Sequence, residues 1–292
     1  MSKKILVIGA NGMLGGSIFR YFSRQGDFAV LGTIRLESNQ QQLLSMGFAN
    51  TIAGIDVSDT QAIEGVFSDF KPDFVFNCVG LIKQLAASKK AVSAIEINAL
   101  LPHRLAELAS HYGGKLIHFS TDCVFSGTAG MYQEHDTPDA TDIYGRSKLI
   151  GEVDYTPHLT LRTSIIGHEL NSNVSFVDWF LSQEGTVKGF SNAFFSGLPT
   201  IYVAKFLHQY VLNNAALTGL YHLSVDRIDK FTLLSMIKEV YGKDIAIENY
   251  SDFAIDRSLD SSRLRDAVNF VPPSWLELIQ DMHNEYLLDF TS

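Results

Sequence analysis

The feature that most restricts the fold of this chain is an alternation of short strand-like runs with longer helix-like segments over residues 1–165. The strand-like runs are KKILVIGA, FAVLGTIR, NTIAGID, PDFVFNCVG, KLIHFST and HLTLRTS. Amphipathic segments such as TQAIEGVFSDF and AVSAIEINALLPHRLAELASHYG lie between them. Strands that alternate with helices form parallel sheets covered on both faces. We therefore predict an α/β protein with a Rossmann-type, doubly wound parallel sheet.

The alternation ends after Ser164, and a Gly-, Asn- and aromatic-rich stretch follows. This change predicts a dinucleotide-binding domain over residues 1–165 and a smaller, mainly substrate-binding subdomain over residues 166–292. Residues 200–222 are expected to return to the first domain. Because no Pro/Ser-rich linker separates the two parts, the second should pack on the sheet and close a cleft there.

Composition excludes several classes of protein. The 292 residues are 46% hydrophobic, enough for a sizeable core, and the formal charge of −9 argues against nucleic-acid binding. There is no apolar run that could span a membrane and no secretory signal, so the expected location is the cytoplasm. Two cysteines make no disulfide framework, and nine histidines show no metal-binding spacing, so no metal is predicted. The oligomeric state is open, a homodimer included.

The first strand-like run leads into the glycine-rich stretch IGANGMLGG. Gly9, Gly12 and Gly15 form a G-x-x-G-x-x-G pattern between a strand and a helix. Such glycines permit a tight turn and a close approach of the backbone to a pyrophosphate, which the helix N-terminus then binds. The stretch, with Asn11, Met13 and Leu14, is predicted to bind a dinucleotide; the alternative is an ordinary turn.

Two further segments bear on the cofactor. Arg35 follows the second strand, where NAD-selective sites carry an acidic residue, and its guanidinium could pair with a 2′-phosphate. The alternative is a surface arginine, and Glu37 keeps NAD open. Asp56 and Val57 follow the third strand and could border the adenine, although Asp56 could equally be a turn or capping residue.

Polar groups also end the fourth and fifth strands. Cys78, Val79 and Gly80 would bring the backbone past the cofactor, and the fifth strand ends with Thr121, for which turn chemistry is the plain alternative.

Tyr144 and Lys148 lie four residues apart in TDIYGRSKLIGEV, so on a helix they share one face. Chance alone supplies about half of one such pair in a chain of this composition, so the pair gains meaning only beside the other features.

These motifs together resemble those of the extended short-chain dehydrogenase/reductase family. The chain is most similar to the dTDP-4-dehydrorhamnose reductase branch, because STDCVFSG, YGRSKLIGE, LRTSIIG, SGLPT and GLYHLS occur in the order of that branch. The resemblance implies an oxidoreductase that reduces the 4-keto group of a nucleotide-linked 6-deoxyhexose in polysaccharide biosynthesis. It implies NADP(H) as the preferred cofactor, with NAD(H) as the alternative.

Residue by residue, the resemblance implies that Thr121, Tyr144 and Lys148 form the catalytic triad. Asn98 occupies the place of a helix-bending asparagine, and we expect it near the substrate with Asp122 and Cys123.

The chain departs from the family pattern in two places. Cys123 replaces the common tyrosine of STDYVF, and NAFFSGLPT differs from the usual DQxGSPT, so the sugar and the base could differ.

The expected chemistry is proton donation to the oxygen of a ketone as hydride arrives at its carbon. Lys148, with the positive nicotinamide, is expected to lower the pKa of Tyr144, and Thr121 is expected to hydrogen-bond the substrate carbonyl. Two other functions remain open: a sugar-nucleotide epimerase or dehydratase with tightly bound NAD, and a non-catalytic NADP-binding regulatory subunit.

Overall fold

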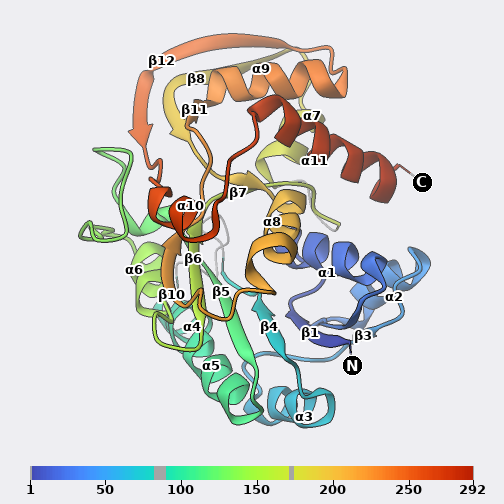
Figure 1. Cartoon of the computed structure of the whole chain (residues 1–292). Coiled ribbons are helices and arrows are strands. Elements are labelled where there is room, and N and C mark those ends of the chain that lie inside the picture. Colours follow the sequence, from blue (N-terminus) through green and yellow to red (C-terminus); the bar gives the residue numbers. More distant parts are fainter. Residues whose placement is uncertain (1, 82–89, 171–173, 292) are drawn as a thin grey trace.

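A seven-stranded sheet with the order β10-β6-β5-β4-β1-β2-β3 forms the centre of the protein (Figure 1). The computed structural model describes residues 2–81, 90–170 and 174–291. The strands of this sheet are β1 (Lys3–Ile8), β2 (Phe28–Thr33), β3 (Thr51–Ile52), β4 (Phe74–Asn77), β5 (Lys115–Thr121), β6 (Leu159–Thr163) and β10 (Gly219–His222). All of its strand pairs are parallel. The predicted fold class is confirmed.

The strand order reverses direction between β1 and β4. In sheets of this type, ligands bind at such a switch point.

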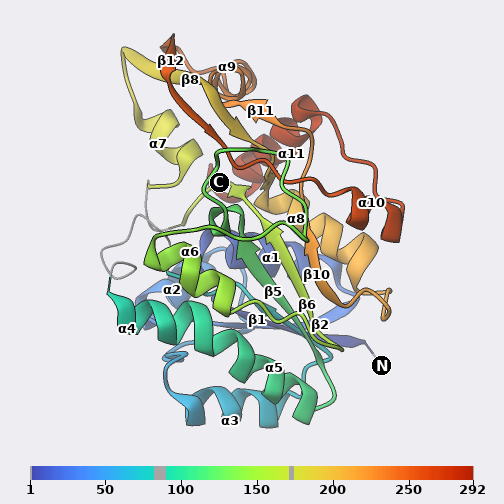
Figure 2. The same cartoon turned by 90° about the vertical axis from the view of Figure 1, so that its left-hand side faces the viewer.

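Helices cover both faces of the sheet. One face carries α1 (Met13–Gln25) and α8 (Thr200–Phe206), and the other carries α3 (Thr60–Phe70) and α5 (Leu101–His111), as Figures 1 and 2 show. Within β1, Ile5 and Val7 belong to the first core, whereas Leu6 and Ile8 belong to the second. A strand buried on both faces has a continuous run of apolar residues in its sequence, which is why KKILVI predicted a strand of the central sheet.

The long helix expected over residues 91–113 is divided. It consists of α4 (Ala91–Ala94), a π-helical turn η2 (Ile95–Leu100) and α5. Asn98 lies within this turn, and its carbonyl oxygen is so close to Gly151 that a Cβ there would overlap it. Helix α6 (Ile143–Ile150) packs on η2, so the local widening of the helix accommodates the end of α6.

The C-terminal part is a separate layer above the carboxyl ends of the sheet (Figure 1). Its strands are β7 (Ile165–Ile166), β8 (Thr186–Phe195), β9 (Leu198–Pro199), β11 (Ile228–Asp229) and β12 (Ala246–Asp256), and its helices are α7 (Phe176–Ser182), α9 (Lys230–Tyr241), α10 (Ser262–Val268) and α11 (Trp275–Asp289). The shorter remaining elements are α2 (Glu37–Ser45), η3 (Asp122–Val124) and η4 (Leu207–Val211). Residues 246–256, for which no element was predicted, form β12, which pairs in parallel with β8.

Segments from the second half of the chain nevertheless join the first. Strand β10 extends the central sheet beside β6, and α8 packs against α1. The boundary at residues 165 and 166 stays a prediction.

Buried polar contacts fix α11 to α1. Ser17 Oγ donates to Glu285 at 2.6 Å, and Arg20 Nε donates to Asp289 at 2.6 Å.

In the described part of the chain, no helix is long and apolar enough to cross a membrane.

Candidate active site

The glycine-rich turn lies between β1 and α1, where the glycine pattern predicted it. Gly9 has φ of +86°, a conformation that favours glycine, and the Gly12 N–H donates to the Gly9 carbonyl at 3.1 Å. A Cβ on Gly15 would overlap the carbonyl oxygen of Gly9 and lie 3.0 Å from Cys78 Cβ. The helix therefore approaches the turn more closely than any side chain would allow.

The N-terminus of α1 has the character of a phosphate site. Its N-cap, Gly12, supplies no side-chain hydrogen bond, and the first turn contains no acidic residue. The first N–H groups of the helix, from Met13 and Leu14 onward, thus lack a side-chain cap and carry the positive end of the helix dipole. A cradle lined by glycines, with no carboxylate in the first turn of α1, fits the pyrophosphate of a dinucleotide. Asn11, half-buried, stands within the same turn.

Residues after β4 lie beside this cradle. A Cβ on Gly9 would come within 2.8 Å of Val79 Cγ2, and the Cys78 N–H donates to the Ile8 carbonyl at 3.1 Å. Burial raises the pKa of the Cys78 thiol, so the side chain stays neutral. Gly80 is exposed at the end of the same segment. The structure thus brings the glycine turn and the end of β4 together.

The predicted adenosine-side residues lie after β2 and β3. Arg35 is exposed two residues beyond β2, at the carboxyl edge of the sheet. Asp56 is exposed and accepts a hydrogen bond from the Ser58 N–H at 2.9 Å, which is the turn role kept as its alternative. Val57 is partly buried against the core beneath it.

The end of β5 carries Thr121. This residue is 7% exposed; its hydroxyl accepts from the Cys123 N–H at 3.1 Å and donates to Asp122 Oδ1 at 3.1 Å. The turn chemistry foreseen for Thr121 is therefore present, and the same side chain also hydrogen-bonds the Tyr144 hydroxyl.

Helix α6 brings Tyr144 and Lys148 to Thr121. The helix begins at Ile143, where the Asp142 carboxylate accepts from the Gly145 N–H at 2.8 Å. A Cβ on Gly145 would overlap the Cys123 carbonyl, so a glycine lets α6 dock on the segment after β5. Thr121 and Tyr144 thus meet in one place, with Lys148 one helical turn behind them.

The expected lowering of the pKa of Tyr144 is wrong for the protein groups themselves. Burial raises this pKa, the neighbouring Cys123 raises it further, and the hydrogen bond with Thr121 lowers it only in part. Burial is the main cause. Lys148 does not offset it, because its ammonium points to the Phe119 carbonyl of β5 at 2.7 Å. A tyrosine with a raised pKa keeps its proton near neutral pH, as a proton donor must.

Lys148 is 6% exposed, and burial lowers its pKa to about 8, an effect that Glu152 opposes. Its Nζ also lies 3.4 Å from His118 Nε2. Glu152 is itself bound by Arg162 and by Ser120 at 2.7 Å each. An amine with a pKa near 8 can hold or release a proton in the physiological range.

Two charged groups from the C-terminal layer lie near the same site. Burial raises the pKa of Asp122, whereas Arg257 and, more weakly, Lys230 lower it. Burial lowers the pKa of Lys230 and raises that of Cys123 to about 12. Lys230 begins α9, and Arg257 Nε donates to the Phe125 carbonyl at 2.9 Å. Two cations therefore lie near Asp122 and Cys123. Neither was among the predicted site residues, because both lie more than 100 residues away in the chain.

Asn98 is placed differently from the other predicted substrate residues. It is fully buried; its Oδ1 accepts from the Leu81 N–H at 2.8 Å, and its Nδ2 lies 3.3 Å from Ser147 Oγ. This placement favours a role in fixing α6 and the segment after β4, and not contact with a substrate.

Among residues 2–81, 90–170 and 174–291, no group of three His, Cys, Asp or Glu residues is arranged to hold a metal ion.

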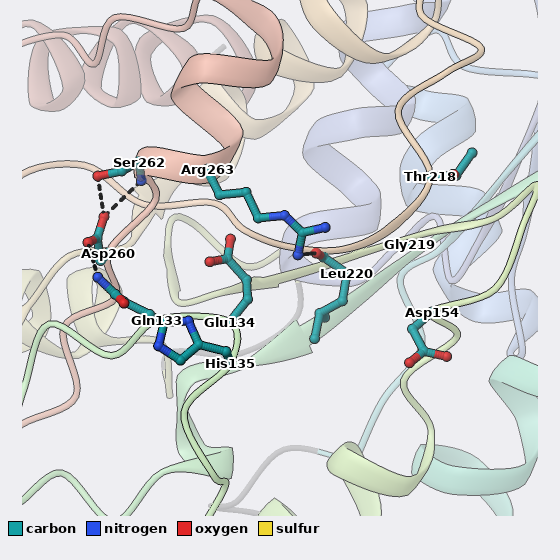
Figure 3. Close-up of a pocket in the computed structure, with 10 residues that line it drawn as sticks. All are labelled: Gln133, Glu134, His135, Asp154, Thr218, Gly219, Leu220, Asp260, Ser262 and Arg263. Carbon is teal, nitrogen blue, oxygen red and sulfur yellow. Dashed lines mark hydrogen bonds between the residues drawn. The ribbon is translucent and has the colours of Figure 1, made fainter.

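A cavity of about 640 Å³ lies away from these residues, along the outer edge of β10 (Figure 3). The Glu134 carboxylate accepts from the His222 N–H at 2.8 Å, and Arg263 donates to the Leu220 carbonyl at 3.2 Å. These two side chains satisfy backbone groups of an edge strand that would otherwise invite pairing with another chain. None of the predicted site residues lines this cavity.

The β1–glycine turn–α1 unit, with Thr121, Tyr144 and Lys148 at the carboxyl edge of the sheet, is the arrangement that the motifs predicted for an extended short-chain dehydrogenase/reductase. A family profile described as the RmlD substrate binding domain matches residues 3–288. The chain belongs to this family, and the family resemblance expected from its motifs is confirmed.

Two curated relatives of the chain are proteins of different kinds, one named as a reductase and the other as a subunit of a transferase. The probable low-salt glycan biosynthesis reductase of Haloferax volcanii is 32% identical over 184 residues, which are 60% of this chain and 59% of that protein. The chain therefore matches less than two thirds of that relative. The methionine adenosyltransferase 2 subunit beta of Danio rerio is 25% identical over 256 residues, or 82% of this chain and 74% of that protein.

Solved structures share the whole fold. The dTDP-4-dehydrorhamnose reductase of Bacillus anthracis, in complex with NADP, has a TM-score of 0.79 at 21% identity and covers 97% of this chain and 99% of its own. The Bordetella bronchiseptica enzyme WbmG, in complex with NAD and UDP, has a TM-score of 0.77 at 19% identity and covers 97% and 94%. At these identities the likeness concerns the fold.

Proposed function

We propose that the protein is an NAD(P)H-dependent reductase of the 4-keto group of a nucleotide-linked 6-deoxyhexose. The observation that carries the proposal is the meeting of Thr121, Tyr144 and Lys148 beside a glycine cradle that fits a dinucleotide. The likeness to a glycan biosynthesis reductase and to the fold of an NADP-bound dTDP-4-dehydrorhamnose reductase supports it.

Each of the three proposed catalytic residues has one task in this reaction. A bound NAD(P)H supplies the hydride that reduces the ketone carbon. Tyr144 gives its proton to the ketone oxygen, and its raised pKa keeps that proton in place beforehand. Thr121 hydrogen-bonds the same oxygen, and Lys148 returns a proton to the phenolate. The sum is one hydride and one proton added across the carbonyl.

NADP(H) is the proposed cofactor, with NAD(H) as the alternative. Arg35 stands exposed beyond β2, where a guanidinium can pair with a 2′-phosphate. The related structures in complex with NADP and with NAD support both forms.

The proposed substrate carries a diphosphate, and Lys230 and Arg257 supply positive charge near Asp122 and Cys123. The proposed reaction belongs to nucleotide-sugar and polysaccharide synthesis in the cytoplasm, without nucleic acid, membrane or metal.

A panel of dTDP-, UDP- and GDP-linked 4-keto-6-deoxysugars tests the proposal. The protein is mixed with NADPH and each sugar, and the loss of reduced cofactor is followed optically. Oxidation with at least one sugar, and the matching 6-deoxysugar as product, is the expected result. No oxidation with any sugar, from protein that binds NADPH, would contradict it.

The second candidate is a non-catalytic NADP-binding regulatory subunit, because the methionine adenosyltransferase 2 subunit beta matches 82% of the chain. A chain of this kind would bind NADPH, fail in the sugar panel and form a stable complex with a methionine adenosyltransferase catalytic subunit in size-exclusion chromatography. An active reductase without such a complex excludes it.

A further inference from the structure

A buried chain of polar side chains runs behind Lys148. Asn77 ends β4, His118 lies in β5, and the two are paired in the register of these neighbouring strands. Asn77 Nδ2 lies 3.1 Å from His118 Nδ1, and His118 Nε2 lies 3.4 Å from Lys148 Nζ. Asn77 and His118 are 1% and 0% exposed. Buried polar groups are costly unless paired, so the direction of each hydrogen bond in this chain is determined by its neighbours.

The contacts of Asn77 determine which atom donates and which accepts in each hydrogen bond of this chain. Its Oδ1 accepts a hydrogen bond from the Val79 N–H at 3.2 Å, which turns the amide nitrogen toward His118. An amide nitrogen only donates, so His118 Nδ1 must accept. The neutral imidazole then carries its proton on Nε2, and this N–H faces the amine of Lys148.

The charge state of His118 follows from its surroundings. Burial, then the charges of Lys148 and His103, lower its pKa well below the ordinary value, so the ring stays neutral. An Nε2–H group repels the N–H bonds of an ammonium but donates readily to the lone pair of a neutral amine. The Phe119 carbonyl, at 2.7 Å, accepts from Lys148 in either state.

We propose that His118, held by Asn77 in its Nε2–H tautomer, is a positioning residue that stabilises the neutral amine of Lys148 after this lysine has given up a proton. The inference rests on the proposed reductase function in one respect, namely that Lys148 reprotonates the Tyr144 phenolate. In that step an N–H bond of the Lys148 ammonium breaks and the O–H bond of Tyr144 forms. The amine left behind then accepts from His118 Nε2–H and later recovers a proton from water.

Glu152 opposes this effect, because its charge favours the ammonium. Its carboxylate is, however, engaged by Arg162 at 2.7 Å through Nε and again at 2.7 Å through Nη2. The other titratable groups that face the pair are His103, toward His118, and Tyr144 on the same helix as Lys148.

The first test reads the tautomer directly in the full-length protein. Nitrogen NMR of chain labelled with [15N]histidine distinguishes a protonated from a bare ring nitrogen, and the His118→Gln variant assigns the resonance. A protonated Nε2 and a bare Nδ1, unchanged between pH 6 and 9, is the expected result. A protonated Nδ1 would overturn the proposal.

The second test follows Lys148 without any substrate. The 13Cε resonance of Lys148, assigned through Lys148→Arg, is titrated in the wild type, in His118→Met and in His118→Gln. Methionine fills the space but donates nothing, so the midpoint of the lysine titration should rise by about 0.5–1 pH unit, the size that one hydrogen bond gives. Glutamine keeps a donor near the Nε2 position and should restore the midpoint to within about 0.3 unit of the wild type.

His135→Met is the matched control, because the side chain of His135 is 79% exposed and contacts neither residue of the pair. An equal midpoint in the wild type and in His118→Met would overturn the inference, even if the protein reduces keto-sugars. Conversely, the expected shifts in a chain inactive with every keto-sugar would contradict the proposed function and leave the pairing of His118 with Lys148 intact.

Discussion

Replacing Tyr144 by phenylalanine removes one oxygen atom from the proposed proton donor. The ring remains in place, and the Thr121 hydroxyl keeps Asp122 and the Cys123 N–H as partners. The free energy of unfolding should therefore change by no more than about 1 kcal/mol. The glycine cradle is untouched, so cofactor affinity should stay within about twofold of the wild type, a change of about 0.4 kcal/mol.

The effect on turnover should be far larger. A positioned proton donor contributes about 10²–10⁴ to a rate, which corresponds to roughly 2.7–5.4 kcal/mol of barrier at 1.36 kcal/mol per factor of ten. We place Tyr144→Phe near the upper end of this range, because Tyr144 is the phenol that hydrogen-bonds Thr121 and burial keeps its pKa above the ordinary value of 10.0. The assay is the oxidation of NADPH with the keto-sugar that proves active, together with cofactor titration by fluorescence.

Tyr250→Phe is the control for this experiment. Tyr250 lies in β12, where its ring packs against Phe190 and Lys188, so its hydroxyl should have no influence on turnover. If Tyr144→Phe retains more than about a tenth of wild-type kcat, the assignment of the proton donor is refuted.

Three further predictions concern the cofactor and the stability of the fold. Arg35→Ala should weaken NADPH binding about 10–100-fold while NADH binding changes little, and equal losses in a binding titration would contradict the pairing with a 2′-phosphate. Gly15→Ala places a Cβ against the Gly9 carbonyl and should lower the affinity for either cofactor at least about tenfold, whereas Gly65→Ala, which meets open space on α3, should not. Burial lowers the pKa of His222 to about 4, below its ordinary 6.5, so the folded state resists a proton that the unfolded chain accepts. Stability should therefore fall by about 2 kcal/mol from pH 7 to pH 5 in urea unfolding, and an unchanged pH dependence in His222→Gln would argue against this cause.

The sequence predicted the elements whose local signals and tertiary roles agree. Residues 60–70 were expected as a helix and form α3, because Asp59 caps them and apolar residues recur on one face. Residues 115–121 were expected as a strand and form β5, which is buried throughout. Strands β8 and β12 were not predicted, because β12 is largely exposed and its residues follow no simple alternation.

The same difference between local and tertiary signals applies to the candidate site. Tyr144 and Lys148 could be predicted because their spacing is local to one helix and Asp142 marks where that helix begins. The partners of Lys148 could not be predicted. They lie on strands buried on both faces, and the sequence of such a strand does not indicate which neighbour each side chain contacts. The raised pKa of Tyr144 was equally hidden, since it depends on burial by segments far apart in the chain.

The polar residues buried behind α6 also bear on the choice between a reductase and a binding subunit. Asn77, His118 and Lys148 are each less than a tenth exposed, and a buried amine beside a neutral imidazole costs stability that apolar side chains of similar size would not. A chain that only binds NADP(H) and a partner has no use for an amine whose pKa lies near 8. A reductase does, because its tyrosine must regain a proton in every turnover. The cost carried by these residues therefore favours catalysis over binding alone.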